Sequence, residues 1–131
     1  MFDLKTRILV LDDMMTMRKI VIKNLKDLGY TDIQEAADGN LGWDLLEKST
    51  PPVQLIISDW NMPNCSGLDL VKKVRASAIY AKTPFIMLTA EAEATQVKEA
   101  LVSGVTNYMV KPFQAETLKQ KLEQTHKKVT G

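Results

Sequence analysis

The segment IISDWNMPNCSG, residues 56–67, leads from an apolar run into an aspartate and then into a loop of turn-forming residues. A second segment, ILVLDD at residues 8–13, likewise leads from apolar residues into two aspartates. Uninterrupted apolar runs of this kind are typical of strands buried on both faces of a sheet. If both runs belong to one sheet, Asp12, Asp13 and Asp59 share one end of it, where their like charges repel and need compensation.

Short apolar runs alternate with helical patterns along the whole chain. We expect strands at residues 7–11, 32–36, 53–58, 84–89 and 107–110. A helix is expected after each strand, and the first has apolar residues at helical spacing: Met17, Ile20, Val21, Leu25 and Leu28. Gly29 and Gly104 are expected to end the first and fourth helices. Five repeats of strand and helix predict an α/β fold, a doubly wound parallel sheet with helices on both faces.

Composition limits the classes of protein to consider. The chain has 131 residues, of which 45% are hydrophobic, and this predicts a single domain spanning residues 1–131. Its net charge of +1 gives no signal for nucleic-acid binding, and its single cysteine, Cys65, excludes an intramolecular disulfide. No stretch has the length and apolarity of a membrane span, so we expect no membrane insertion and a cytoplasmic location.

Four of the five expected strands end in a polar group that can take part in chemistry. The first ends in Asp12 and Asp13, the third in Asp59, the fourth in Thr89 and the fifth in Lys111. Ligands of open α/β sheets bind beyond the carboxyl ends of the strands. A single aspartate after a strand is usually a turn former or a helix cap, but the joint occurrence of these groups favours a functional site.

The residue types suggest which chemistry this site performs. One lysine cannot neutralise three carboxylates, whereas a hard divalent cation can, and oxygen ligands without histidine favour Mg²⁺. Thr89 and Lys111 are suited to bind the oxygens of a phosphoryl group. A carboxylate can itself act as the nucleophile and give an aspartyl phosphate. The pattern alone leaves open which of the three aspartates receives the phosphoryl group.

Five motifs carry a resemblance to a known family: DDMMTMRKIV, EAADG, SDWNMPN, TAEA and YMVKPF. From about residue 5 to residue 127 the chain resembles the receiver domains of two-component response regulators, and among them the single-domain chemotaxis regulators. The resemblance implies a flavodoxin-like fold with five helices and strand order 2-1-3-4-5. It also implies a phosphoacceptor signalling domain with self-phosphorylation and self-dephosphorylation chemistry, rather than a conventional enzyme.

The resemblance assigns a role to each site residue. It implies that Asp59 is the phosphoacceptor, that Asp13, Asp59 and the backbone carbonyl of Asn61 hold Mg²⁺ directly, and that Asp12 acts mainly through a bound water. Thr89 and Lys111 are then expected to bind phosphoryl oxygens, and the bond from Lys111 to the following proline is expected to be cis.

The resemblance further implies a switch and a set of partners. Thr89 and Tyr108 would couple phosphorylation to a surface formed by the fourth helix, the fifth strand and the fifth helix. The residues expected on or near this surface are Val97, Leu101, Val105, Val110 and Lys121. Asn61 and Glu91 would modulate the lifetime of the phosphoryl group. The expected partners of this monomer are a histidine kinase as phosphodonor and a flagellar motor switch protein, with a phosphatase as a further candidate. We expect no output domain, so the signal would pass by protein–protein contact.

Three other interpretations are open at this point. A haloacid-dehalogenase-type phosphatase also has an aspartate nucleophile, but it needs Asp-x-Asp after the first strand, where this chain has adjacent Asp12 and Asp13. A flavodoxin-like electron carrier needs a phosphate loop rich in Thr, Ser and Gly after the first strand, where two carboxylates would here repel a flavin phosphate. A receiver that serves as a phosphate sink or relay intermediate would have the same site residues.

Overall fold

The computed structural model describes residues 1–90 and 94–130, in which strands and helices alternate. The strands are β1 (Ile8–Leu11), β2 (Ile33–Ala36), β3 (Leu55–Asp59), β4 (Phe85–Thr89) and β5 (Asn107–Val110). The helices are α1 (Met15–Asp27), α2 (Gly39–Lys48), α3 (Gly67–Ala76), α4 (Ala94–Ser103) and α5 (Ala115–Thr130). Neighbouring strands are parallel and follow the order β2-β1-β3-β4-β5, so the predicted flavodoxin-like fold and its strand order are confirmed.

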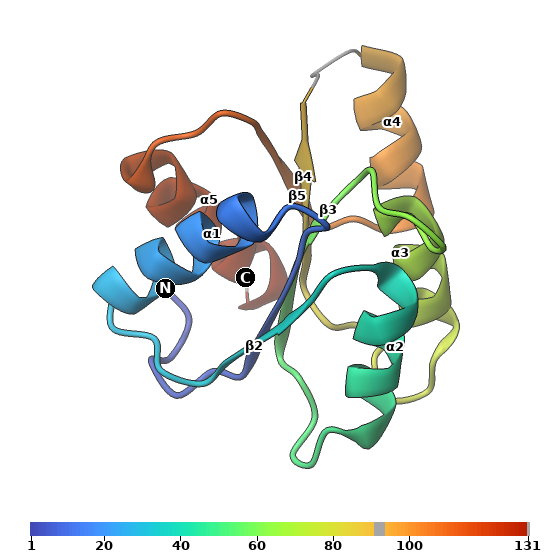
Figure 1. Cartoon of the computed structure of the whole chain (residues 1–131), viewed down its shortest axis with the longest axis horizontal. Coiled ribbons are helices and arrows are strands. Elements are labelled where there is room, and N and C mark those ends of the chain that lie inside the picture. Colours follow the sequence, from blue (N-terminus) through green and yellow to red (C-terminus); the bar gives the residue numbers. More distant parts are fainter. Residues whose placement is uncertain (91–93, 131) are drawn as a thin grey trace.

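The helices form one layer on each face of the sheet (Figure 1). Helices α1 and α5 cover one face, and α2, α3 and α4 cover the other. Along β1, Ile8 and Val10 join the apolar cluster that includes residues of α1 and α5, whereas Leu9 and Leu11 join the cluster that includes residues of α2 and α3. All four side chains are fully buried, which explains why this strand is apolar throughout. No helix in the described part of the chain is long and apolar enough to span a membrane.

Two glycines end helices as predicted. Gly29 follows α1 with a φ of +106°, and Gly104 follows α4 with a φ of +109°. This left-handed conformation is one that glycine adopts without the steric cost that a Cβ atom brings. Both helices therefore end where the sequence places their terminating glycines.

The buried face of α1 differs from the prediction at positions 20 and 22. Val21, Ile22 and Leu25 are buried, whereas Ile20 is 43% exposed. Apolar residues stand at both position 20 and position 22, so helical spacing alone does not fix the rotation of the helix. In the structure Arg18 and Lys19 both reach Glu35 of β2, an arrangement that accompanies the outward orientation of Ile20.

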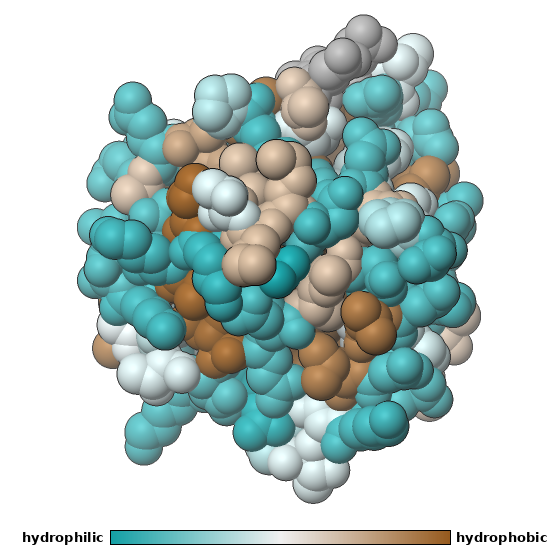
Figure 2. Space-filling view, viewed as in Figure 1, coloured by the Kyte–Doolittle hydropathy of each residue, from teal (hydrophilic) through white to brown (hydrophobic). Residues whose placement is uncertain are grey.

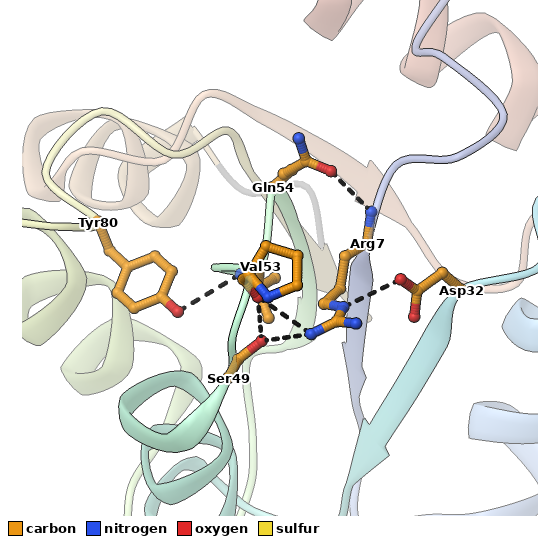
Figure 3. A network of polar contacts seen from close by, with 7 residues as sticks. Arg7, Asp32, Ser49, Val53, Gln54 and Tyr80 are labelled. Carbon is orange, nitrogen blue, oxygen red and sulfur yellow. Dashed lines mark hydrogen bonds and ion pairs between the residues drawn. The ribbon is translucent and has the colours of Figure 1, made fainter.

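A polar network closes the amino end of the sheet (Figure 3). The Arg7 guanidinium lies 3.0 Å from a carboxylate oxygen of Asp32 and donates to Ser49 Oγ and to the backbone oxygen of Pro51. The Arg7 backbone N–H donates to Gln54 Oε1 at 3.0 Å. The network thus connects residues that precede β1, β2 and β3, and it gives the Arg7 cation both a counter-charge and further acceptors.

Candidate functional site

Parallel strands bring the predicted site residues to one edge of the sheet. Asp12 follows β1, Asp59 is the last residue of β3, and Thr89 is the last residue of β4. Leu11 pairs with Ser58 across β1 and β3, so the aspartates that follow each of them emerge side by side. One carboxylate oxygen from each of Asp12, Asp13 and Asp59 lies within 4.8 Å of the others. The three carboxylates therefore form one cluster, as the strand-end pattern predicts.

Lys111, which follows β5, reaches into this cluster. Its Nζ lies 2.9 Å from Asp59 Oδ1 and 3.4 Å from Asp12 Oδ2. Backbone groups fix the two buried carboxylates, because Met14 N–H donates to Asp12 Oδ1 and Trp60 N–H donates to Asp59 Oδ1, both at 2.9 Å. The lysine is thus paired with two of the three carboxylates.

Burial is unequal among the three aspartates. Asp12 is fully buried and Asp59 is 6% exposed, whereas Asp13 is exposed. Burial raises the pKa of Asp59, the hydrogen bond from Lys111 opposes this, and the neighbouring charge of Asp12 adds to it. Burial also disfavours the Lys111 cation, but the hydrogen bond from Asp59 and the charges of both aspartates outweigh it and raise the pKa of Lys111. Lys111 therefore stays a cation at neutral pH.

The cluster has the composition of a site for a hard cation. It offers oxygen donors alone, and three carboxylates face a single ammonium group, so negative charge is left over. Such a donor set fits Mg²⁺, which prefers carboxylate oxygens and shares its coordination with phosphate. Asn61, the fourth predicted ligand, lies exposed in the loop after β3.

A small pocket lies beside the end of β3. It has a volume of about 170 Å³ and is lined by Trp60, Asn61, Thr89, Ala90 and Gln96. Thr89 itself is 5% exposed, at the end of β4. Asn61 and Thr89, predicted from separate motifs, thus border the same space. Glu91, the other predicted modulating residue, lies outside the described residues.

Tyr108, the predicted switch residue, lies on the strand next to that of Thr89. It pairs with Met87 across β4 and β5, two positions before Thr89, and its ring is half-buried against the core. Lys121 of α5 places its Nζ 4.9 Å from the centre of this ring. Val105, expected near the same surface, is 5% exposed and packs in the core.

A larger hollow lies away from the carboxylates, where α1, β2 and α2 meet. Its volume is about 430 Å³, and its lining includes Arg18, Glu35, Leu41 and Asp44. On the face of the molecule seen in Figure 2, apolar side chains are scattered among hydrophilic ones. Arg18 and Glu35 already pair at 2.7 Å, and none of the three clustered aspartates lines this hollow. We therefore place the candidate site at the strand ends.

Comparison with known proteins agrees with this fold. The family model of the response regulator receiver domain matches residues 8–123, and the chain belongs to this family. Among curated proteins, a chemotaxis protein CheY homolog of Campylobacter jejuni is 50% identical over 117 residues, which are 89% of each chain. Chemotaxis protein CheY of Pseudomonas aeruginosa is 42% identical over 125 residues, 95% of this chain and 99% of that one.

Solved structures give the same result. The chemotaxis response regulator CheY4 of Vibrio cholerae superposes with a TM-score of 0.85 at 36% sequence identity, covering 92% of this chain and 98% of the other. The chain is thus a receiver domain of two-component signalling whose relatives act in chemotaxis.

Proposed function

We propose that this chain is a chemotaxis response regulator that accepts a phosphoryl group from a histidine kinase on Asp59. The observation that carries the proposal is the position of Asp59, which lies at a strand end, within the three-carboxylate cluster and 2.9 Å from Lys111. Family membership and relatives named as chemotaxis proteins support the same conclusion.

In this proposal the residues of the chain position the reacting groups. A carboxylate oxygen of Asp59 attacks the phosphorus of a phosphohistidine, and the phosphorus–nitrogen bond breaks with its electron pair passing to the imidazole nitrogen. Lys111 donates a hydrogen bond to one phosphoryl oxygen and the Thr89 hydroxyl donates to another. Lys111 supplies positive charge where negative charge gathers, which is the main contribution that proteins make to phosphoryl transfer.

The same proposal includes Mg²⁺ as the cofactor. Asp13, Asp59 and the Asn61 carbonyl would hold the ion, with Asp12 acting through a water. When bound, the ion supplies the positive charge that Lys111 alone does not provide. Asn61 and Glu91 are proposed to control the access of the hydrolytic water and hence the lifetime of the phosphoryl group.

Labelling with a small phosphodonor tests the acceptor. With acetyl phosphate and Mg²⁺, wild type should gain an acid-stable, base-labile phosphoryl group on Asp59, measured by mass spectrometry. Asp59→Asn keeps the size of the side chain but removes the nucleophile, so labelling should be lost. Asp27→Asn, at an exposed carboxylate of α1, is the matched control and should be labelled like wild type. Equal labelling of Asp59→Asn at position 59 would contradict the proposal.

We further propose that the phosphorylated form binds a flagellar motor switch protein through the surface of α4, β5 and α5. Phosphorylation can change this surface only by favouring one of two states, and in this proposal Thr89 and Tyr108 couple the site to it. In wild type, phosphorylation should raise the affinity for the partner by about 5- to 150-fold. Thr89→Ala should still be phosphorylated but should lose part of this gain. Titration of a switch-protein segment into both forms measures this gain, and equal affinities would instead favour a phosphate sink or relay intermediate.

A further inference from the structure

The loop between β3 and α3, residues 60–66, is held by the start of a different helix. Asn64 Nδ2 donates to Asp38 Oδ2 at 3.2 Å, and the backbone N–H of Gly39 donates to the backbone oxygen of Cys65 at 3.1 Å. Asp38 and Gly39 lie 20 or more residues before the loop, so these contacts connect α2 to the segment that follows Asp59. The loop is thus attached to α2 by one side-chain bond and one backbone bond.

Two close approaches show how tightly this loop is packed. A Cβ atom at Gly39 would lie 2.6 Å from the backbone oxygen of Cys65, closer than real contacts allow. A Cβ atom at Gly67 would overlap the backbone oxygen of Asp59, and the Gly67 N–H donates to the Trp60 oxygen at 2.9 Å. Glycine is needed where backbones approach this closely. The loop is therefore held by the start of α2 at Asn64 and Cys65, and by the first residue of α3 at Trp60.

Asp38 uses its two carboxylate oxygens for two different tasks. Oδ1 accepts from the backbone N–H of Leu41 at 2.9 Å and so caps α2, while Oδ2 accepts from Asn64. The hydrogen bond from Leu41 is the main cause that lowers the pKa of Asp38, which keeps the side chain a carboxylate at neutral pH. Asn64 has a φ of +67°, a left-handed conformation that asparagine tolerates better than most residues. Its side chain and its backbone thus both serve the shape of this loop.

We propose that Asp38 is a positioning residue of the metal site, which acts by holding the loop that carries Asn61. The inference rests on the proposed function, because it takes the Asn61 carbonyl as a ligand of Mg²⁺. Substitution of a residue that orients a ligand without touching the metal typically costs about 10- to 100-fold in metal affinity. Asp38 holds the loop from the N-cap of α2, and α2 contributes no residue to the carboxylate cluster.

The test measures Mg²⁺ affinity from the fluorescence of Trp60, in a Trp43→Phe background that removes the other tryptophan. Asp38→Ser keeps an oxygen able to cap α2 but removes the oxygen that holds Asn64. We expect its dissociation constant for Mg²⁺ to rise about 10-fold. Asp44→Ser removes the same charge from an exposed position of the same helix and is the matched control, expected to bind like the background protein.

Asn64→Gly provides an independent variant. It removes the amide that Asp38 holds, while glycine accepts the left-handed backbone at this position. We expect a loss of Mg²⁺ affinity in the same direction. If Asp38→Ser and Asn64→Gly both bind Mg²⁺ as tightly as Asp44→Ser, the inference is overturned while the metal site stands. If the background protein gives no response to Mg²⁺, both the inference and the proposed metal site fail.

Discussion

The two ends of the sheet both carry charged groups, but they differ in whether those charges are balanced by neighbouring residues. At the amino end, Arg7 meets Asp32 at 3.0 Å and two further oxygen acceptors (Figure 3). At the carboxyl end, Lys111 is shared between two aspartates, and the third, Asp13, adds more negative charge to the cluster. One end is balanced by its own residues, and the other has negative charge in excess.

This difference separates stability from function within one set of strands. A charge that finds all its partners inside the protein contributes to folding, and removing it leaves those partners unpaired. Like charges held together are unfavourable for the folded state unless a ligand compensates them. Proteins retain such unfavourable arrangements at sites where the ligand or the chemistry requires them. We therefore expect substitutions at the two ends to change stability in opposite directions.

The largest effect is expected at the amino end. Arg7→Met keeps most of the aliphatic stem but removes the guanidinium that donates to Asp32, while the Pro51 oxygen keeps the Ser49 hydroxyl as a donor. Loss of hydrogen bonds to a charged group should lower the free energy of unfolding by about 3 kcal/mol. Urea denaturation measures this change. Lys23→Met is the matched control, because its ion pair with Asp27 is exposed and should be worth less than about 1 kcal/mol.

Magnesium should stabilise the protein through the carboxyl end. At a free concentration one hundred times its dissociation constant, a ligand of the folded state alone adds about 2.7 kcal/mol to the free energy of unfolding. Wild type should gain on this scale when Mg²⁺ is titrated during urea denaturation. Asp13→Asn, which removes an exposed carboxylate of the cluster, should gain much less at the same concentration. Equal gains in both proteins would argue that the ion binds elsewhere.

The smallest effect is expected on the edge strand β2, where Glu35 pairs with Val10 of β1. The hydrogen bond from Lys19, followed by that from Arg18, lowers the pKa of Glu35 below its usual range. These contacts therefore stabilise the fold above the unfolded-state pKa of about 4.3, and the stabilisation is lost as the pH falls through the folded-state pKa. Because the Glu35 side chain is 35% exposed, Glu35→Gln should cost less than about 0.5 kcal/mol near neutral pH.

Urea denaturation at neutral and at acidic pH checks this prediction. The stabilities of wild type and Glu35→Gln should converge once Glu35 is protonated in both the folded and the unfolded state. Glu47→Gln, an exposed glutamate on α2, is the control and should match wild type at either pH. A difference that persists unchanged in acid would show that the charge of Glu35 is not the cause.

Sequence reasoning predicted most of the sheet because its signals are local. Each apolar run stands directly next to the polar residue that ends its strand, as the run of β4 does to Thr89. Parallel pairing then brings these ends together without further information. The cis bond between Lys111 and Pro112 was expected from the family resemblance and is present.

The features that sequence reasoning missed depend on distant residues. Arg7 contacts partners 25 to 47 positions away, and nothing local to it marks the network. The motif EAADG was noted without a role, and its Asp38 proves to hold Asn64, 26 positions away. The unequal burial of the adjacent Asp12 and Asp13 also depends on the path of the chain from β1 to α1, which the spacing of apolar residues does not reveal.

The most direct test of the contrast between the two ends is the stability of Asp59→Asn without Mg²⁺. Because burial raises the folded-state pKa of Asp59, stability falls as the pH rises from the unfolded-state pKa through the folded-state pKa and this carboxyl ionises. Asn removes that charge and the repulsion from Asp12. Urea denaturation at neutral pH should therefore find Asp59→Asn more stable than wild type, by about 1 kcal/mol, the scale seen when functional strain is relieved. A variant destabilised as strongly as Arg7→Met would contradict the account, because Asp59 would then serve folding rather than phosphoryl transfer.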